Sequence, residues 1–242
     1  MTATPFVLTA ATTYLHGYDL TSDNNKLAIK YTAADLDVTT FGSSGAMTRI
    51  AGLRDVEADY EGFWGANSGG NDAEFFPDLG TADRVFTVSK TGTAGDTALL
   101  FQAGKFTVDL FGEVGQPAPF ALTAMGTSAQ GLVRGGLAKA KGNVSATGAL
   151  GSVLNLGAVS ATQYLYATVH IFTAGTTITL QLQTDDNSGF TSPTTVQTIG
   201  PLTTTGGTWA TRVAGALTDT YQRINVSAVT GTFSIAAAIG VA

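Results

Sequence analysis

The pattern of apolar and polar positions predicts a chain built of short β-strands. Apolar and polar side chains alternate over Lys26–Tyr31, Val56–Trp64 and later runs, with turn-forming residues between them. A period of two places successive side chains on opposite faces of a strand. Many such runs with turn signals between them are typical of a sandwich or barrel. We therefore predict an all-β, mainly antiparallel fold, a β-sandwich with at most one short helix.

The strand signals are spread over the whole chain. Residues 96–101 fit either a short helix with an Asp N-cap or a further strand, and residues 65–81 have no periodicity, which indicates a loop. Strands are predicted at Lys26–Tyr31, Leu36–Phe41, Val56–Trp64, Arg84–Ser89, Lys105–Phe111, Phe120–Ala124, Leu132–Leu137, Tyr164–Phe172, Thr177–Gln183, Thr195–Ile199, Trp209–Val213, Tyr221–Ala228 and Thr232–Ile239.

A Gly-, Ser- and Ala-rich stretch, Lys141–Gly157, is the best candidate for a domain boundary. We expect residues 1–142 to form one β-sandwich domain. Residues 143–242 hold enough strands for a small sandwich of their own, either as a second β-rich domain or as an extension of the first.

One strand has a strongly acidic face. Glu57, Asp59 and Glu61 share one face of Val56–Gly62, and the opposite face carries apolar side chains. Side chains two apart on a strand lie roughly 6.5–7 Å from each other. Like charges at that spacing repel, more so in a dry site than in water. The carboxylate face is therefore expected to be wet and the other face to be buried.

This acidic face also raises the question of catalysis. Two same-face carboxylates could fit the roughly 6.5–9.5 Å separation of inverting glycosidases. Such enzymes need the pKa values of the two groups to be pushed apart by different environments, whereas Glu57 and Asp59 share one. A solvated face is the better interpretation.

The remaining chemistry-bearing residues are few. The two histidines, His16 and His170, lie far apart in sequence, and the chain has no cysteine, which disfavours a zinc site. Asp185–Gly189 suggests a calcium loop but lacks the downstream Glu of an EF-hand, so an Asx turn explains it better. We expect a protein that is not an enzyme and has no metal or cofactor.

Charge is unevenly distributed along the chain. The net charge is −6, and residues 1–113 hold 15 acidic and 7 basic residues. An acidic first half argues against a surface that grips phosphates. With neither a secretory signal nor a long apolar run, we expect a soluble protein made in the cytoplasm, with no membrane partner.

The predicted loop contains two adjacent phenylalanines, Phe75 and Phe76. They are either an anchor for a neighbouring subunit or a pair that packs back onto the core. Unusually long loops in compact domains are often functional.

Three pieces of the first half, in order and spacing, resemble the major tail (tail-tube) proteins of bacteriophages with long, non-contractile tails. They are the Asp-Val-Thr-Thr-Phe-Gly-like segment Leu36–Gly42, the Gly-Leu-Arg-Asp turn within Ile50–Asp55, and the alternating strand Val56–Gly62. Gly112–Gly115 and Val133–Gly135 resemble later segments of these proteins.

The resemblance implies a structural virion protein made in the host cytoplasm. Subunits with a β-sandwich and a flanking helix would form hexameric or pseudo-hexameric rings, which stack into a tail tube lined by a continuous β-barrel. Its partners would be copies of itself, other tail proteins, and double-stranded DNA that passes through without specific binding. We expect Glu57, Asp59 and Glu61 to line the lumen, and Phe75 and Phe76 to contact the next ring.

Residues 143–242 depart from single-domain members of that family. This part could complete the first sandwich, sit outside the tube, or serve as a second tube domain in a trimeric ring. One alternative function is a capsid decoration or head-fibre protein. Another is a carbohydrate-binding module with a stacking platform formed by Trp64, Trp209, Tyr164 and Tyr166. Core or cross-strand packing explains Trp209 and the two tyrosines better.

Overall fold

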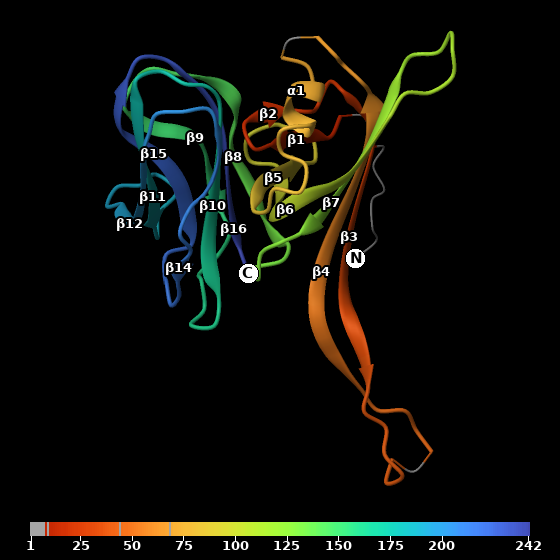
Figure 1. Cartoon of the computed structure of the whole chain (residues 1–242). Helices are drawn as coiled ribbons and strands as arrows, with labels where there is room; N and C mark the ends of the chain where they lie inside the picture. Colours follow the sequence, from red (N-terminus) through yellow and green to blue (C-terminus); the bar gives the residue numbers. More distant parts are fainter. Residues whose placement is uncertain (1–7, 9, 44, 68) are drawn as a thin grey trace. The chain divides into compact units, whose positions relative to one another are not determined.

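The computed structural model describes residues 8, 10–43, 45–67 and 69–242, and nearly all of its regular structure is antiparallel β-sheet (Figure 1). The predicted all-β class is confirmed. Within the described residues the single helix is α1, Asp72–Phe75. The strands are β1 Thr12–Leu15, β2 Tyr18–Asp19, β3 Asn24–Asp37, β4 Arg49–Phe63, β5 Arg84–Ser89, β6 Thr97–Leu110, β7 Pro119–Gly126, β8 Val133–Val144, β9 Gly148–Asn155, β10 Tyr164–Thr173, β11 Thr177–Asp185, β12 Thr194–Leu202, β13 Gly206–Trp209, β14 Val213–Ala214, β15 Tyr221–Thr230 and β16 Phe233–Val241.

Backbone contacts divide the chain into two compact units that are interleaved in sequence. Unit 1 comprises Met1–Asp23, Arg84–Gln102 and Val133–Ala242, and unit 2 comprises Asn24–Asp83 and Ala103–Leu132. The boundary expected at residues 142/143 falls inside β8, which pairs with β16 along its length. Pairing between distant segments, rather than local composition, therefore decides how the chain is divided.

Unit 2 is built on a four-stranded antiparallel sheet in the order β3-β4-β7-β6. One face of this sheet is dry. On β4 the alternation buries Val56, Ala58 and Tyr60 to 1% exposure or less. Helix α1 packs on this side through Phe75, whose ring centroid lies 5.0 Å from that of Phe120 on β7.

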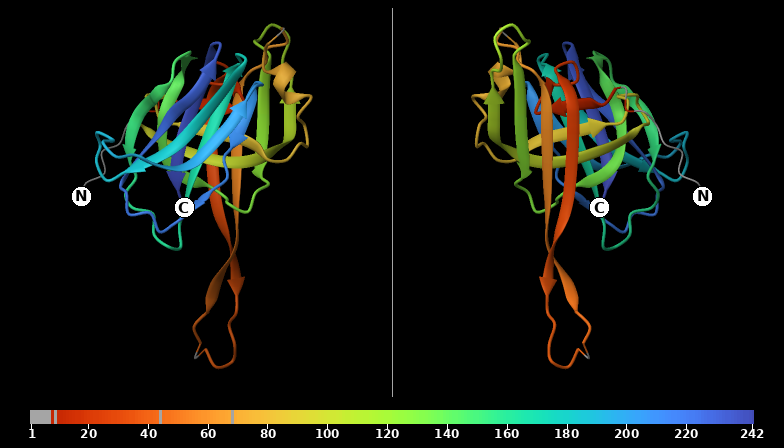
Figure 2. Two further views of the ribbon diagram at one scale, coloured as in Figure 1. Left: turned by 90° about the vertical axis from the view of Figure 1, so that its left-hand side faces the viewer. Right: turned by 90° about the vertical axis from the view of Figure 1, so that its right-hand side faces the viewer.

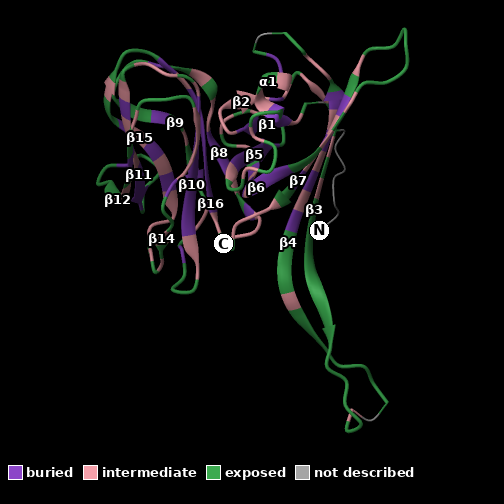
Figure 3. Ribbon diagram, in the orientation of Figure 1, coloured by how far each residue is buried: buried purple, intermediate pink, exposed green. Residues whose placement is uncertain are grey.

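The β3–β4 hairpin extends well beyond the rest of the unit 2 sheet as a two-stranded arm (Figure 1). β7 pairs with β4 only over Glu57–Phe63, whereas β3 and β4 continue to the pair Asp37↔Arg49. This corrects two expectations. The predicted strand Leu36–Phe41 ends at Asp37, and the segment read as a Gly-Leu-Arg-Asp turn is part of β4. Figure 3 shows the arm as almost wholly exposed.

Unit 1 is a two-sheet sandwich (Figure 2). One sheet has the order β12-β11-β15-β9, and the other runs β13-β10-β16-β8 and on through the first half of β6 to β5, β1 and β2. The main core fills the space between them, with Leu165, Ile178, Leu180, Ile224 and Phe233 at 0% exposure.

The β10-β16-β8 part of the larger sheet is buried on both faces. In β16, Ile235 and Ile239 join the main core, while Ala236 and Ala238 face a second cluster with Tyr14 and other residues. Strands buried on both sides read as continuous apolar runs rather than alternating ones. This explains the mainly apolar, non-alternating character of the strands predicted at Tyr164–Phe172 and Thr232–Ile239.

Candidate functional site

The most distinctive surface of the molecule is the wet face of the unit 2 sheet, which we call the carboxylate face. Its central row is Glu57, Asp59 and Glu61 on β4, all half-buried, while the intervening residues are buried. The predicted alternation of this strand is confirmed. The side chains are held in place by a dry, well-packed opposite face.

The three carboxylates have partners on both neighbouring strands. Glu61 is ion-paired with Lys26 on β3, and Glu57 lies 3.2 Å from the ammonium group of Lys30. Asp59 accepts a hydrogen bond of 2.8 Å from the hydroxyl of Thr123 on β7. Exposed ion pairs of this kind contribute about 0.2–1 kcal/mol each. They orient the carboxylates more than they stabilise the fold.

Two further acidic residues, which lie outside the predicted row of Glu57, Asp59 and Glu61, extend this face. Asp55 precedes the row on β4, and the cross-strand register aligns Glu61 with Ala121 and then with Asp109 on β6. The face thus holds five carboxylates and two lysines. Asp55 continues the two-residue spacing of Glu57, Asp59 and Glu61, which is a signal in the sequence. Asp109 joins the face through the register of β6 with β7, which no local pattern predicts.

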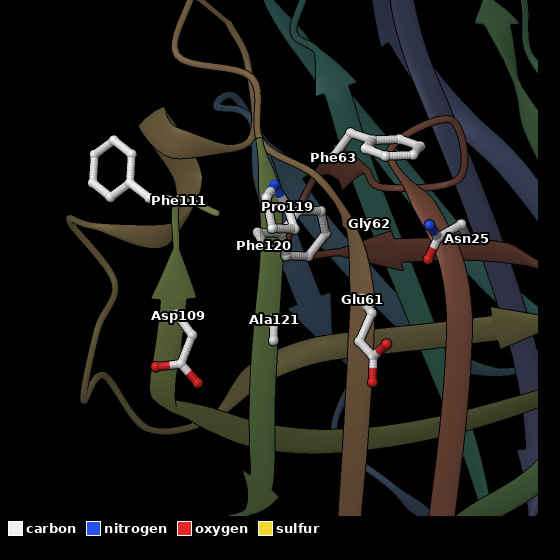
Figure 4. Close-up of a pocket in the computed structure, with 9 residues that line it drawn as sticks. All are labelled: Asn25, Glu61, Gly62, Phe63, Asp109, Phe111, Pro119, Phe120 and Ala121. Carbon is white, nitrogen blue, oxygen red and sulfur yellow. The ribbon is translucent and has the colours of Figure 1, made fainter. Parts of the chain in front are cut away.

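One end of the carboxylate face is hollowed into a mainly apolar groove of about 230 Å³ (Figure 4). Glu61 and Asp109 flank it on either side of Ala121, as the labelled side chains show. At its upper end the rings of Phe63 and Phe111 are 52% and 68% exposed. The groove therefore combines exposed aromatic surface with two carboxylates.

The segment 65–81, predicted to be an unstructured loop, is firmly anchored within unit 2. The indole N–H of Trp64 donates to Asp72 at 2.9 Å, and the amide of Asn71 donates to the carbonyl of Phe63 at 2.9 Å. Lys105, whose side chain is 0% exposed, donates to the carbonyl of Glu74 and lies 3.3 Å from the carboxylate of Asp78.

This anchoring separates the two phenylalanines that were expected to contact the next ring. Phe75 is 0% exposed because it packs on Phe120, so its side chain is not available to a partner, and the core-packing alternative holds for it. Phe76 is 62% exposed and keeps its place as a candidate contact.

The histidines, expected to be unrelated sheet residues, lie close enough in unit 1 to influence each other. His170 is fully buried; its Nδ1 accepts from the amide of Gly17 at 3.3 Å and its Nε2 lies 2.9 Å from the hydroxyl of Thr87. Burial, together with the charge of His16, lowers the pKa of His170 to about 3. It is therefore neutral near pH 7.

The Asp185–Gly189 segment forms the predicted Asx turn. The two carboxylate oxygens of Asp185 accept from the amides of Asn187 and Ser192, both at 2.9 Å. These amide bonds lower the pKa of Asp185. Across the described residues, no group of three or more His, Cys, Asp or Glu is placed to hold a metal ion.

Of the suggested aromatic platform, three residues are packing partners in unit 1. Tyr166 is 3% exposed, and its ring centroid lies 5.8 Å from that of Trp209 and 6.4 Å from that of Tyr164. All three pack in or against the second core cluster. Trp64 belongs to unit 2, where it packs edge-on against Phe111 at 4.9 Å. The expectation of core or cross-strand packing is confirmed for the three in unit 1.

Comparison with known proteins gives neither a matching family model nor a matching curated protein. Three solved structures show similarity to this chain. A chain in the virion of a native gene transfer agent particle is 16% identical, with 46% of this chain and 82% of that chain covered and a TM-score of 0.36. A chain in the tail of an empty gene transfer agent particle, solved with C6 symmetry, is 18% identical, with 51% and 92% covered and a TM-score of 0.41.

The third is the Dit protein of SPP1, described as a paradigm of the hub adsorption apparatus of phages that infect Gram-positive bacteria. It is 14% identical, with 95% of this chain and 98% of that chain covered and a TM-score of 0.36. The function of this chain is therefore inferred from its own residues. Among the described residues, no helix has the length and apolar character needed to cross a membrane.

Proposed function

We propose that this protein is a structural component of a phage tail, in which copies of unit 2 assemble side by side into a ring. The carboxylate face lines the channel of this ring, and double-stranded DNA passes along it without being bound. The observation that carries the proposal is a sheet with one dry face, one carboxylate-rich wet face and open edges.

The open edges supply the lateral contact. Within unit 2 the outer strands are β3, which is 14 residues long, and the second half of β6. An exposed strand edge has backbone groups ready to pair with another chain, and closing the sheet into a barrel removes such edges. Lys26 and Lys30 on β3 are drawn onto the carboxylate face by their ion pairs, so they leave the backbone edge accessible.

The charge distribution suits a conduit for DNA. Unit 2 holds 12 acidic and 5 basic residues, a net charge of −7, while unit 1 holds 6 acidic and 7 basic residues, a net charge of +1. A ring would concentrate the negative charge of the carboxylate faces around its channel. Phosphates are repelled by such a surface, so DNA would slide rather than adhere.

The β3–β4 arm supplies the contact between rings. It presents exposed apolar side chains that need a cover in the assembled particle: Leu36, Val38, Phe41, Met47, Ile50 and Leu53. The occupant we propose for the groove of Figure 4 is the arm of a second copy, because both surfaces are apolar and the groove's Glu61 and Asp109 match the arm's Arg54 in charge. This contact replaces Phe75 as the main link between rings.

Negative-stain electron microscopy of the purified protein, over a range of concentrations, tests this function. Stacked rings or hollow tubes support a tail-tube protein. Single rings that do not stack support a hub or adaptor ring and exclude the tube. A monomer or small compact oligomer at every concentration contradicts the proposal and favours a decoration protein.

A further inference from the structure

The two outer strands of the unit 2 sheet match each other in direction. β3 pairs antiparallel with β4, β4 with β7 and β7 with β6, so β3 and β6 run in opposite directions. A copy related by rotation about a ring axis would present its β3 antiparallel to β6, and the alternation of strands would continue across the joint. The backbone groups of the two strands then face each other as in any antiparallel ladder.

The available part of the β6 edge is short. Beside Lys105 this edge is already covered, because the amide of Gly80 donates to the Lys105 carbonyl at 2.7 Å and Leu79 forms a bridge with Lys105. In the part of the chain that the structure describes, residues 107–110 pair with β7 alone and β3 pairs with β4 alone. A joint between copies would therefore use the last residues of β6.

Both edges carry apolar side chains that unit 2 leaves partly uncovered. Tyr31 on β3 is 41% exposed, Phe106 on β6 is 49% exposed, and Leu79 beside β6 is 51% exposed. Covering such side chains with a neighbouring copy is favourable, but apolar contact is non-directional. It supplies affinity and leaves the register of the two strands to other groups.

On the carboxylate face the two edges have opposite charges. β3 carries Lys26 and Lys30, whose side chains remain 61% and 68% exposed within their ion pairs. β6 carries Asp109, which is exposed and whose carboxylate forms no ion pair or hydrogen bond with another described residue. Residues of opposite charge on adjacent strands attract each other. A lysine held between its own glutamate and the Asp109 of a neighbour would complete a network of three charges.

The spacing of the two lysines suits a staggered joint. The register places Lys26, Glu61, Ala121 and Asp109 at one level of the sheet. The strands of a closed barrel are tilted, and their pairing is staggered by a fixed amount. Lys30 lies four residues beyond Lys26 on the same face. A joint without stagger and one staggered by four residues therefore both place a lysine opposite Asp109.

We propose that Asp109 of one copy pairs with a β3 lysine of the next copy, and that this pair sets the register at which the copies join. The inference rests on the proposed ring and identifies the charges that select the partner edge. Complementary charges contribute more to register and partner choice than to affinity. A carboxylate accepts hydrogen bonds at both oxygens, so this pair is compatible with the contact proposed above for Arg54 of the arm.

Sedimentation velocity of the full chain, over a range of concentrations, measures the midpoint concentration of ring formation. Asp109→Lys should raise this midpoint about tenfold or more, because it replaces attraction by repulsion at every joint. Combined with Lys26→Glu or Lys30→Glu, it should assemble better than either single variant, and the lysine that gives this recovery identifies the stagger. Each lysine variant is also measured alone, so that the loss of its own ion pair cancels in the comparison. Asp186→Lys, the same change at an exposed residue of unit 1, is the matched control and should assemble as the unmodified chain does.

The outcomes separate this pair from the ring itself. If the unmodified chain forms no rings at any concentration, the proposed function fails and the pair with it. If rings form, the pair alone is overturned when Asp109→Lys assembles as Asp186→Lys does, or when neither lysine variant offsets it. Should Asp109→Lys fail to fold, Asp109→Asn decides: it should raise the midpoint severalfold, and an unchanged midpoint overturns the pair.

Discussion

His170 shows how the structure fixes the protonation state of a single residue. Its Nδ1 accepts the amide of Gly17, so its Nε2 carries the proton and donates to Thr87, whose hydroxyl lies 3.0 Å from that of Thr168. A second ring proton would face the Gly17 amide in a dry site. The low pKa of His170 itself follows mainly from burial, which disfavours the charged imidazolium, and from the charge of His16.

The low pKa of His170 makes stability depend on pH. The unfolded chain takes up a proton near pH 6.5, whereas the folded chain does so only near its folded pKa of about 3. Between these values the unfolded state binds more protons, so the free energy of unfolding falls as pH drops. We expect a loss of about 3 kcal/mol at pH 4.5 from this residue. His170→Gln, compared by urea unfolding at pH 7.5 and 4.5, should lose most of this difference; an unchanged pH dependence would contradict it.

Lys105 ties the α1 segment to the unit 2 sheet. Its buried ammonium group meets Asp78 and the carbonyl of Glu74, and lies 5.9 Å from the centre of the Phe75 ring. Removing one partner of a buried ion pair leaves the other uncompensated. Lys105→Ala should therefore lower the free energy of unfolding by about 3 kcal/mol, measured by urea unfolding. Lys30→Ala removes an exposed ion pair and is the control, expected to cost less than about 1 kcal/mol. Equal losses in the two variants would refute the anchoring role of Lys105.

At the scale of elements, the role of the β3–β4 arm in assembly can be tested by a substitution that leaves the fold unaffected. Phe41 at its tip is fully exposed, so Phe41→Asp should change the free energy of unfolding by less than about 0.5 kcal/mol. It should nevertheless prevent stacking, because the added carboxylate would meet Glu61 and Asp109 of the groove and would have to lose its hydration. Light scattering and electron microscopy measure the extent of stacking. Val153→Asp, which places the same charge on an exposed apolar residue of unit 1, is the matched control and should stack as the unmodified chain does. Tubes formed by Phe41→Asp would exclude the tip from the contact between rings.

Sequence patterns predicted some of these elements well and others poorly, for physical reasons. The alternation over Val56–Gly62 is a local signal that burial imposes directly, so both faces of β4 were predicted correctly. The family resemblance implies a turn at Gly52–Asp55, yet this segment is part of β4 and pairing with β3 holds the strand extended. The groove and the neighbourhood of His16 depend on registers and close glycine contacts between distant segments, which no local pattern encodes.

At the scale of the whole molecule, the two units differ most in charge. If the carboxylate faces keep DNA from adhering, neutralising them should create affinity. We expect the triple variant Glu57→Gln, Asp59→Asn, Glu61→Gln to retain double-stranded DNA on assembled rings at low salt, since Lys26 and Lys30 then lose their partners. Fluorescence anisotropy of labelled DNA measures the affinity of the rings for DNA. A matched triple variant in unit 1, Asp96→Asn, Asp186→Asn, Asp219→Asn, should bind DNA no better than the unmodified chain.

The same change in DNA affinity in both triple variants would show that overall charge, and not the carboxylate face, controls DNA binding. No DNA affinity in either would contradict the role given to this face.

The central claim is that the carboxylate face of unit 2 lines the channel of a ring. A cryo-electron microscopy map of the assembled protein tests it most directly. The account predicts β3 of one copy beside β6 of the next, with Glu57, Asp59 and Glu61 on the inner wall. A ring with these residues on its outer wall, or with unit 2 sheets that do not meet, would contradict it.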